Sequence, residues 1–130
     1  MKLWVDDVRP VPDGYIWCKS VNDVKNLIED VEGVIEELRS KLTVRYSHHE
    51  ERQQYRINEI QSQIEQMTIT LIDIDHDAGD YAKDGGDYIR LLDWLEETGR
   101  HYPIRIHSMN PVGVQNMRAI IQRNGWTEVK

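Results

Sequence analysis

The stretch Leu71-Ile72-Asp73-Ile74-Asp75-His76-Asp77-Ala78-Gly79 decides how this 130-residue chain is interpreted. Its apolar first half is typical of a buried strand, and that strand ends in a carboxylate, an imidazole, a second carboxylate and a glycine. Ligands bind beyond the carboxyl ends of the strands in an open α/β sheet. We therefore predict a central strand at residues 68–74, followed directly by a functional site.

Two other apolar stretches end in the same way. Residues 2–5 run into Asp6-Asp7, and residues 104–106 run into His107-Ser108-Met109-Asn110. Because parallel strands present their carboxyl ends at one edge, these polar groups converge if the three strands are neighbours. Strands that alternate with helices through short connections predict an α/β fold with an open, mainly parallel sheet.

The remaining segments complete this sheet. A second strand is predicted at residues 15–19, and the turn-rich loop before it leaves no room for a crossover helix. Ser20 is a plausible N-cap for the helix that follows. Asp87 is a plausible cap for a later helix, after a mobile loop at residues 78–86. Residues 126–129 are expected to add a short last strand.

An insertion is predicted between the second and third strands. Apolar residues recur at spacings of three and four within residues 28–42 and 57–67, and the register breaks at residues 44–50. One helix from residue 21 to 44 would be about 36 Å long, whereas a five-residue strand spans about 17 Å. We therefore expect one domain, residues 1–130, with an antiparallel coiled-coil-like helical hairpin at residues 29–67 that serves self-association or binds a partner.

Composition limits the classes of function. A net charge of −7 argues against duplex nucleic acid as the main partner but permits a small anionic ligand. No apolar run approaches the ~20 residues needed to span a membrane, so a cytoplasmic protein is expected. Cys18 is the only cysteine, which excludes an intramolecular disulfide and predicts a buried, inert thiol.

Three motifs carry a resemblance to a known family. They are Leu3-Trp4-Val5-Asp6-Asp7-Val8-Arg9-Pro10, Asp75-His76-Asp77-Ala78-Gly79 and His107-Ser108-Met109-Asn110-Pro111-Val112-Gly113. Together they resemble the cyclic-phosphate processing receiver-like family, a divergent relative of response-regulator receiver domains. The resemblance covers residues 1–28 and 69–122. It implies a receiver-like (flavodoxin-like) fold and the handling of cyclic phosphates.

The resemblance also implies roles for individual residues. Asp6 and Asp7 match the paired acids that bind a divalent ion in receivers, and Asp75 matches the acid that receivers phosphorylate. Ser108 falls near the receiver hydroxyl position. The family histidines and the asparagine that follows them are matched by His76, His107 and Asn110. The receiver lysine has no match, because no lysine-proline pair follows the last predicted strand.

The chemistry of these groups supports a metal site. Carboxylates that crowd together repel one another, so such a cluster usually needs a cation. Oxygen ligands favour Mg²⁺ or Mn²⁺, and an added imidazole shifts the preference toward Mn²⁺. The candidate ligands are Asp6, Asp7, Asp75 and Asp77. The alternative is that Asp6 or Asp7 caps the turn and that only one of them faces the site.

The two histidines suit proton transfer, since histidine ordinarily titrates at about pH 6.5. His76 and His107 are therefore candidate catalytic residues together with Asp75, and the alternative is that each histidine is structural. The candidate phosphate-binding residues are Arg9, Ser108 and Asn110. The helix that begins at Asn110 would add free backbone amides for an anion. Asn110 could equally be an N-cap.

The role of Asp73 stays open in the sequence. A carboxylate inside a central strand is costly unless it is paired, so Asp73 either positions His76 or His107 or lies nearer a sheet edge. The leading interpretation is a metal-assisted phosphoesterase acting on a cyclic phosphate of a nucleotide or RNA-derived substrate. The alternatives are a protein that only binds a cyclic nucleotide, and a receiver-like signalling domain phosphorylated on Asp75.

Overall fold

The computed structural model describes residues 1–43 and 51–130. These fall into two compact units, one made of Met1–Asn26 with Ile69–Lys130 and the other of Leu27–Thr68. The turn predicted at residues 44–50 lies outside the described residues. Among the helices that the structure describes, none is both long and apolar enough to cross a membrane.

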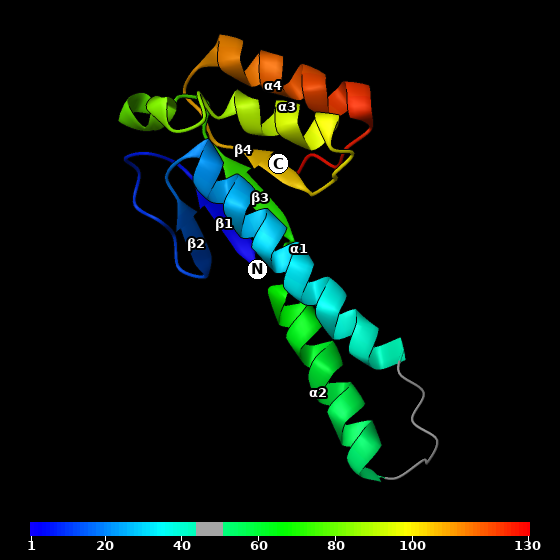
Figure 1. Cartoon of the computed structure of the whole chain (residues 1–130). Helices are drawn as coiled ribbons and strands as arrows, with labels where there is room; N and C mark the ends of the chain where they lie inside the picture. Colours follow the sequence, from blue (N-terminus) through cyan, green and yellow to red (C-terminus); the bar gives the residue numbers. More distant parts are fainter. Residues whose placement is uncertain (44–50) are drawn as a thin grey trace. The chain divides into compact units, whose positions relative to one another are not determined.

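The larger unit is built on a four-stranded sheet whose strands are all parallel. The strands are β1 (Lys2–Val5), β2 (Tyr15–Cys18), β3 (Leu71–Ile74) and β4 (Ile104–Ile106), and their order is β2-β1-β3-β4 (Figure 1). This confirms the predicted α/β fold of the receiver (flavodoxin-like) type. It also places β3 between β1 and β4, so Asp73 lies in an interior strand.

The connection between β1 and β2 is unusual for parallel neighbours. The two strands pair in register from Lys2 with Tyr15 to Val5 with Cys18, yet only the loop of residues 6–14 joins them. Parallel strands normally need a crossover of a dozen or more residues. The predicted loss of the crossover helix is thus confirmed, and the polar end of β1 leads straight into a loop.

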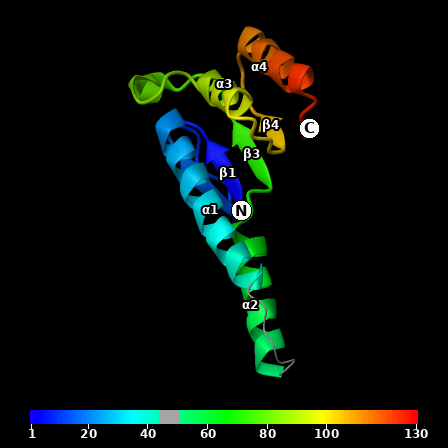
Figure 2. The ribbon, with the colours of Figure 1, turned by 45° about the vertical axis from the view of Figure 1, so that its right-hand side comes forward.

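In the described part of the chain, four α-helices and one short 3₁₀ helix make up the other elements (Figure 2). They are α1 (Val21–Thr43), α2 (Glu51–Met67), η1 (Gly79–Lys83), α3 (Ile89–Glu97) and α4 (Pro111–Asn124). Ser20 caps α1, because its Oγ accepts a hydrogen bond from the Asp23 amide at 3.0 Å. Asn110 is the N-cap of α4, and Gly125, which has a positive φ of 66°, is its C-cap.

The parallel register divides the strand side chains of the larger unit into two sets. One set is apolar and completely buried, and it consists of Leu3, Val5, Ile72, Ile74 and Ile104. Burial of each such side chain contributes about 1.5–3 kcal/mol. α3 packs against α4, and Lys25 of α1 lies 5.8 Å from the ring centroid of Trp94 in α3.

The second set lies on the opposite face of the sheet. Trp4, Asp73 and Arg105 are adjacent in the register, and Trp17 is paired with Trp4 from the other side. This face is more polar, because it combines half-exposed rings and a cationic side chain with the buried Asp73. The sheet therefore has one apolar face and one face that leads toward the polar strand ends.

Three local predictions need correction. Asp87 does not cap α3: the capping residue is Tyr88 without a side-chain bond, and Asp87 accepts from the Ala78 amide at 3.1 Å. The loop at residues 78–86 contains the helical turn η1. The predicted last strand is reduced to one bridge between Ile104 and Glu128, because Pro103 and the short β4 leave little strand to pair with.

The smaller unit consists of the later turns of α1 packed along α2. The apolar spacing predicted for a coiled-coil-like hairpin is present. Ile28 and Val31 near its start are buried, whereas most later apolar positions are only half-buried. The half-buried side chains include Ile35, Leu38, Ile57, Ile60 and Ile64. Two helices alone do not enclose an interior, so these positions stay partly exposed.

Candidate functional site

The site is built at the carboxyl ends of β1 and β3. Asp6 and Asp7 follow β1, Asp75 follows β3, and one carboxylate oxygen from each lies within 4.8 Å of the others. The backbone fixes this arrangement, because the Asp75 amide donates to the Val5 carbonyl at 2.9 Å. Three of the four acids proposed as ligands therefore converge.

Asp6 is completely buried and has a fixed orientation. Its Oδ1 accepts hydrogen bonds from the amides of Val8 at 3.0 Å and Arg9 at 2.9 Å. Burial raises the pKa of Asp6, but these two bonds and the contact with His107 outweigh burial and leave the pKa lowered. Asp6 thus caps the turn and also belongs to the acidic cluster with Asp7, so capping does not remove either carboxylate from the site.

The pKa of Asp7 is raised, in contrast to the pKa of Asp6. Burial raises the pKa of Asp7, and the negative charges of Asp6 and Asp75 raise it further. The chain after β3 passes close to this side chain, because Gly79 has a φ of 54° and a Cβ there would overlap Asp7 Oδ2. A cation among the three carboxylates would relieve the repulsion.

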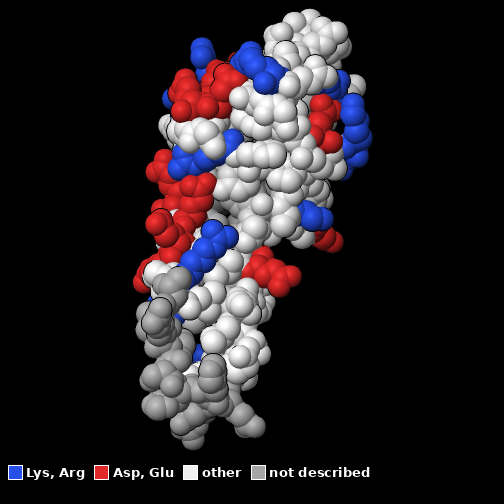
Figure 3. Space-filling model, turned by 90° about the vertical axis from the view of Figure 1, so that its right-hand side faces the viewer, with Lys and Arg blue, Asp and Glu red and all other residues white. Residues whose placement is uncertain are grey.

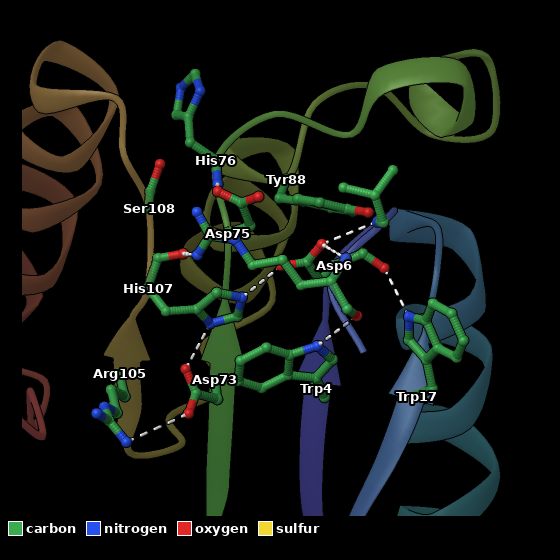
Figure 4. A network of polar contacts seen from close by, with 12 residues as sticks. Trp4, Asp6, Trp17, Asp73, Asp75, His76, Tyr88, Arg105, His107 and Ser108 are labelled. Atoms are coloured by element: carbon green, nitrogen blue, oxygen red, sulfur yellow. Dashed lines mark hydrogen bonds and ion pairs between the residues drawn. The ribbon is translucent and has the colours of Figure 1, made fainter. Parts of the chain in front are cut away.

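His107 lies between two carboxylates, as Figure 4 shows. Its Nδ1 is 2.6 Å from Asp73 Oδ1, and its Nε2 is 2.8 Å from Asp6 Oδ2. The His107 side chain is 12% exposed, whereas Asp6 and Asp73 are at most 1% exposed. The open question about Asp73 is answered, because it pairs with His107 and not with His76.

His76 has a different environment. It points away from Asp6 and His107 (Figure 4), and its Nδ1 is 2.9 Å from Asp77 Oδ1. The ring lies against the first turn of α4, where Gly113 is buried and a Cβ would overlap the ring. Asp77 is 63% exposed and contacts His76, so it lies apart from the three-carboxylate cluster.

The candidate phosphate-binding residues surround this end of the sheet. Asn110 Oδ1 accepts from the Gly113 amide at 3.0 Å, and Ser108 Oγ accepts from the Asn110 amide at 3.2 Å. Arg9 donates through Nη1 to the His107 carbonyl at 3.1 Å. Asn110 is therefore the N-cap of α4, and its Nδ2 is also 3.4 Å from His76 Nδ1.

Three aromatic residues at the site were not predicted from the sequence. Trp4 stacks on His107, and Trp17 donates through Nε1 to the Asp6 carbonyl at 2.8 Å. Tyr88 is completely buried and donates to the Lys19 carbonyl at 2.7 Å. Burial, and then the charges of the three carboxylates, raise the pKa of Tyr88, so its hydroxyl stays neutral. The alternation of β1 and β2 was the available signal for the two tryptophans.

The cluster fits a hard divalent cation. Its donors are three carboxylates, and oxygen ligands are what Mg²⁺ and Mn²⁺ prefer. Both ring nitrogens of His107 face carboxylates, so the geometry does not make His107 a direct ligand. The acidic cluster of Asp6, Asp7 and Asp75 resembles the metal and phosphorylation site of receiver domains.

Comparison with family models identifies a match over nearly the whole chain. A family model for the cyclic-phosphate processing receiver domain matches residues 1–41 and 45–123. Neither the curated proteins nor the solved structures include a significant match to this chain. The matched residues include all three polar strand ends.

Proposed function

The chain belongs to the cyclic-phosphate processing receiver domain family, and we propose that it is a metal-assisted phosphoesterase that opens a cyclic phosphate on a nucleotide or RNA-derived substrate. One observation carries the proposal: the three carboxylates of Asp6, Asp7 and Asp75 converge beside His107 at the carboxyl edge of the sheet. The carboxylates that would hold an ion and the imidazole of His107 are therefore neighbours at this edge of the sheet.

The proposed reaction is the hydrolysis of a cyclic phosphate. Water adds to phosphorus, one P–O bond of the ring breaks, and the leaving alkoxide takes up a proton to give a phosphomonoester. Asp6, Asp7 and Asp75 would hold a divalent ion, which would neutralise charge on the phosphate and activate a water. His107 is the proposed residue that accepts the proton of the attacking water, which requires its Nε2 to exchange the contact with Asp6 for the water while Asp73 holds Nδ1.

The phosphate-binding groups are proposed on the α4 side. Ser108, Arg9 and the start of α4 at Asn110 offer a hydroxyl, a guanidinium and helix amides. His76 borders this side through its contact with Asn110 and is the proposed proton donor to the leaving oxygen. The structure thus gives His107 and His76 different neighbourhoods, which suits two separate proton-transfer roles.

The charge distribution supports a small ligand. On the face drawn in Figure 3, Lys and Arg side chains are interspersed with Asp and Glu side chains. The chain as a whole carries a net charge of −7. Duplex binders concentrate basic residues on one face, so a ligand that presents a single phosphate is the better fit.

The test is turnover of 2′,3′-cyclic and 3′,5′-cyclic nucleotides and cyclic dinucleotides, with and without Mn²⁺ or Mg²⁺. We expect metal-dependent product, its loss in Asp7→Asn, and a loss of about 10²–10⁴-fold in His107→Ala. Asp93→Asn, on the exposed side of α3, is the matched control. Tight binding with ligand recovered unchanged would instead establish a binding protein.

The receiver alternative has its own readout. A small phosphodonor would then label Asp75 with an alkali-sensitive phosphate, and Asp75→Asn would abolish the label. Metal-dependent turnover in a protein that takes up no such label would exclude it.

A second proposal concerns self-association through the smaller unit. It is supported by the half-buried apolar positions of α1 and α2, which a second copy would cover. Replacing Leu38 and Ile60 with Asp should convert an oligomer to a monomer in light scattering while turnover persists. A monomeric wild-type protein would contradict this proposal.

A further inference from the structure

Asp73 is a costly residue in its position. It lies in the interior strand β3, is 1% exposed, and its neighbours along the strand, Ile72 and Ile74, are completely buried. A carboxylate buried in this way needs several compensating contacts. An apolar residue at this position would avoid the cost, so we expect Asp73 to have a function that an apolar residue could not perform.

Each oxygen of Asp73 has a defined partner. Oδ1 faces His107 Nδ1 at 2.6 Å, while Oδ2 accepts from the Tyr15 hydroxyl at 3.3 Å and lies 3.8 Å from Arg105 Nη1. Trp4 closes one flat side of the imidazole. Neither Asp73 nor the His107 ring can turn without breaking these contacts.

The same chain of contacts reaches the acidic cluster. His107 Nε2 meets Asp6 Oδ2, and the amides of Val8 and Arg9 occupy Asp6 Oδ1. A neutral imidazole carries only one N–H. Both contacts can therefore be hydrogen bonds only if each ring nitrogen carries a hydrogen, or if one of the two carboxyl groups carries it. The plane of the Asp6 carboxylate is thereby fixed by three partners before any ligand binds.

We propose that Asp73 is a positioning residue for the ion site: through His107 it fixes the orientation of the Asp6 carboxylate and so sets the affinity of the cluster for a divalent cation. The inference rests on the metal site of the proposed function. Partners of metal ligands act in this way in other sites, where their loss weakens metal binding by about 10–100-fold.

The test measures Mn²⁺ affinity by the electron paramagnetic resonance signal of free Mn²⁺, using the full chain without substrate. Asp73→Asn keeps the shape of the side chain, and we expect it to weaken Mn²⁺ binding by about 10–100-fold. Tyr15→Phe removes one contact to Asp73 and should weaken binding less, in the same direction. Asp93→Asn should bind Mn²⁺ as the wild type does.

A second readout follows the ring itself in the metal-free protein. In ¹⁵N NMR spectra both His107 ring nitrogens of the wild type should show hydrogen-bonded shifts, and the Nδ1 signal should move in Asp73→Asn. A merely structural role for Asp73 would lower stability and leave Mn²⁺ affinity of the folded fraction unchanged. Tyr15→Phe keeps the test decisive if Asp73→Asn does not fold.

The outcomes separate the two claims. Absence of Mn²⁺ and Mg²⁺ binding by the wild type would overturn the metal site of the proposed function. Equal Mn²⁺ affinity in wild type, Asp73→Asn and Tyr15→Phe would overturn only the present inference. Weaker binding in both variants, with a moved His107 signal, would support it.

Discussion

The indole ring of Trp4 lies flat on the imidazole ring of His107, with ring centroids 3.8 Å apart and 2° between the planes. Trp4 belongs to β1 and His107 follows β4, although β3 separates these two strands in the sheet. The stack therefore ties β1 to β4 across β3, which lies between them in the sheet.

Replacing Trp4 should cost stability and release His107. Trp4→Leu removes the stack and part of the half-buried indole, so we expect a loss of about 2 kcal/mol in the free energy of unfolding. Trp4→Phe keeps an aromatic face and should lose less. Urea unfolding measures both, and equal stability of Trp4→Leu and wild type would show that the stack contributes nothing.

Compared with wild type, Asp7→Asn should be more stable without a divalent ion and less stable with one. Because its folded pKa is raised, ionised Asp7 costs stability as pH rises through that pKa, so the variant should melt higher than wild type in EDTA at pH 7. This advantage should vanish below the ordinary pKa of 3.8. With Mn²⁺ at 100 times its dissociation constant, wild type should gain about 2.7 kcal/mol and the variant little.

Gly113 and His76 should be coupled. Ala is a better helix former than Gly by about 1 kcal/mol, but a Cβ at Gly113 would overlap the His76 ring. Gly113→Ala should therefore destabilise the wild type and stabilise a His76→Ala background. A double-mutant cycle of unfolding free energies measures the coupling, and additive effects would contradict the close contact.

The Arg118–Glu128 pair should give an acid-dependent contribution to stability. Arg118 Nε donates to Glu128 Oε1 at 2.7 Å, and this bond is the main cause of the lowered pKa of Glu128. A lowered carboxyl pKa adds stability above the unfolded value and loses it as pH falls through the folded value. Glu128→Gln should lower the melting temperature at pH 7 and match wild type well below pH 4.5.

Cys18 should be unreactive while the protein is folded. Burial raises the pKa of the Cys18 thiol to about 12, so the thiolate that attacks thiol reagents is scarce at pH 8. Modification should be about 1000-fold slower than in urea, where the thiol titrates at about 8.5. Fast labelling of the native protein would show that β2 opens at the edge of the sheet.

Much of the fold follows from short-range patterns. The apolar runs that end in Asp6-Asp7, Asp75 and His107 locate three strands, and the spacing of apolar residues locates α1 and α2. Ser20 and Asn110 mark helix starts because a capping bond reaches only three positions along the chain. Such signals are local, so they can be read without knowing the tertiary structure.

The site was harder to predict because side-chain direction depends on contacts distant in sequence. The pattern could not show that His107 reaches Asp73 across 34 positions while His76 turns toward Gly113. Asp87 illustrates the same limit: it precedes a helix, yet its carboxylate binds the Ala78 amide. Convergence of strand ends was predictable, and the pairing among them was not.

The smaller unit has a consequence for how this chain can vary in length. It lies between β2 and β3, yet Lys2 and Leu71 are still register partners in the sheet. The entropy of closing a loop grows only with the logarithm of its length, about 0.6 kcal/mol for each doubling. Lengthening or trimming α1 and α2 by whole turns is therefore expected to be a mild perturbation, and versions of this domain with helices of very different length can share the same cluster of acids.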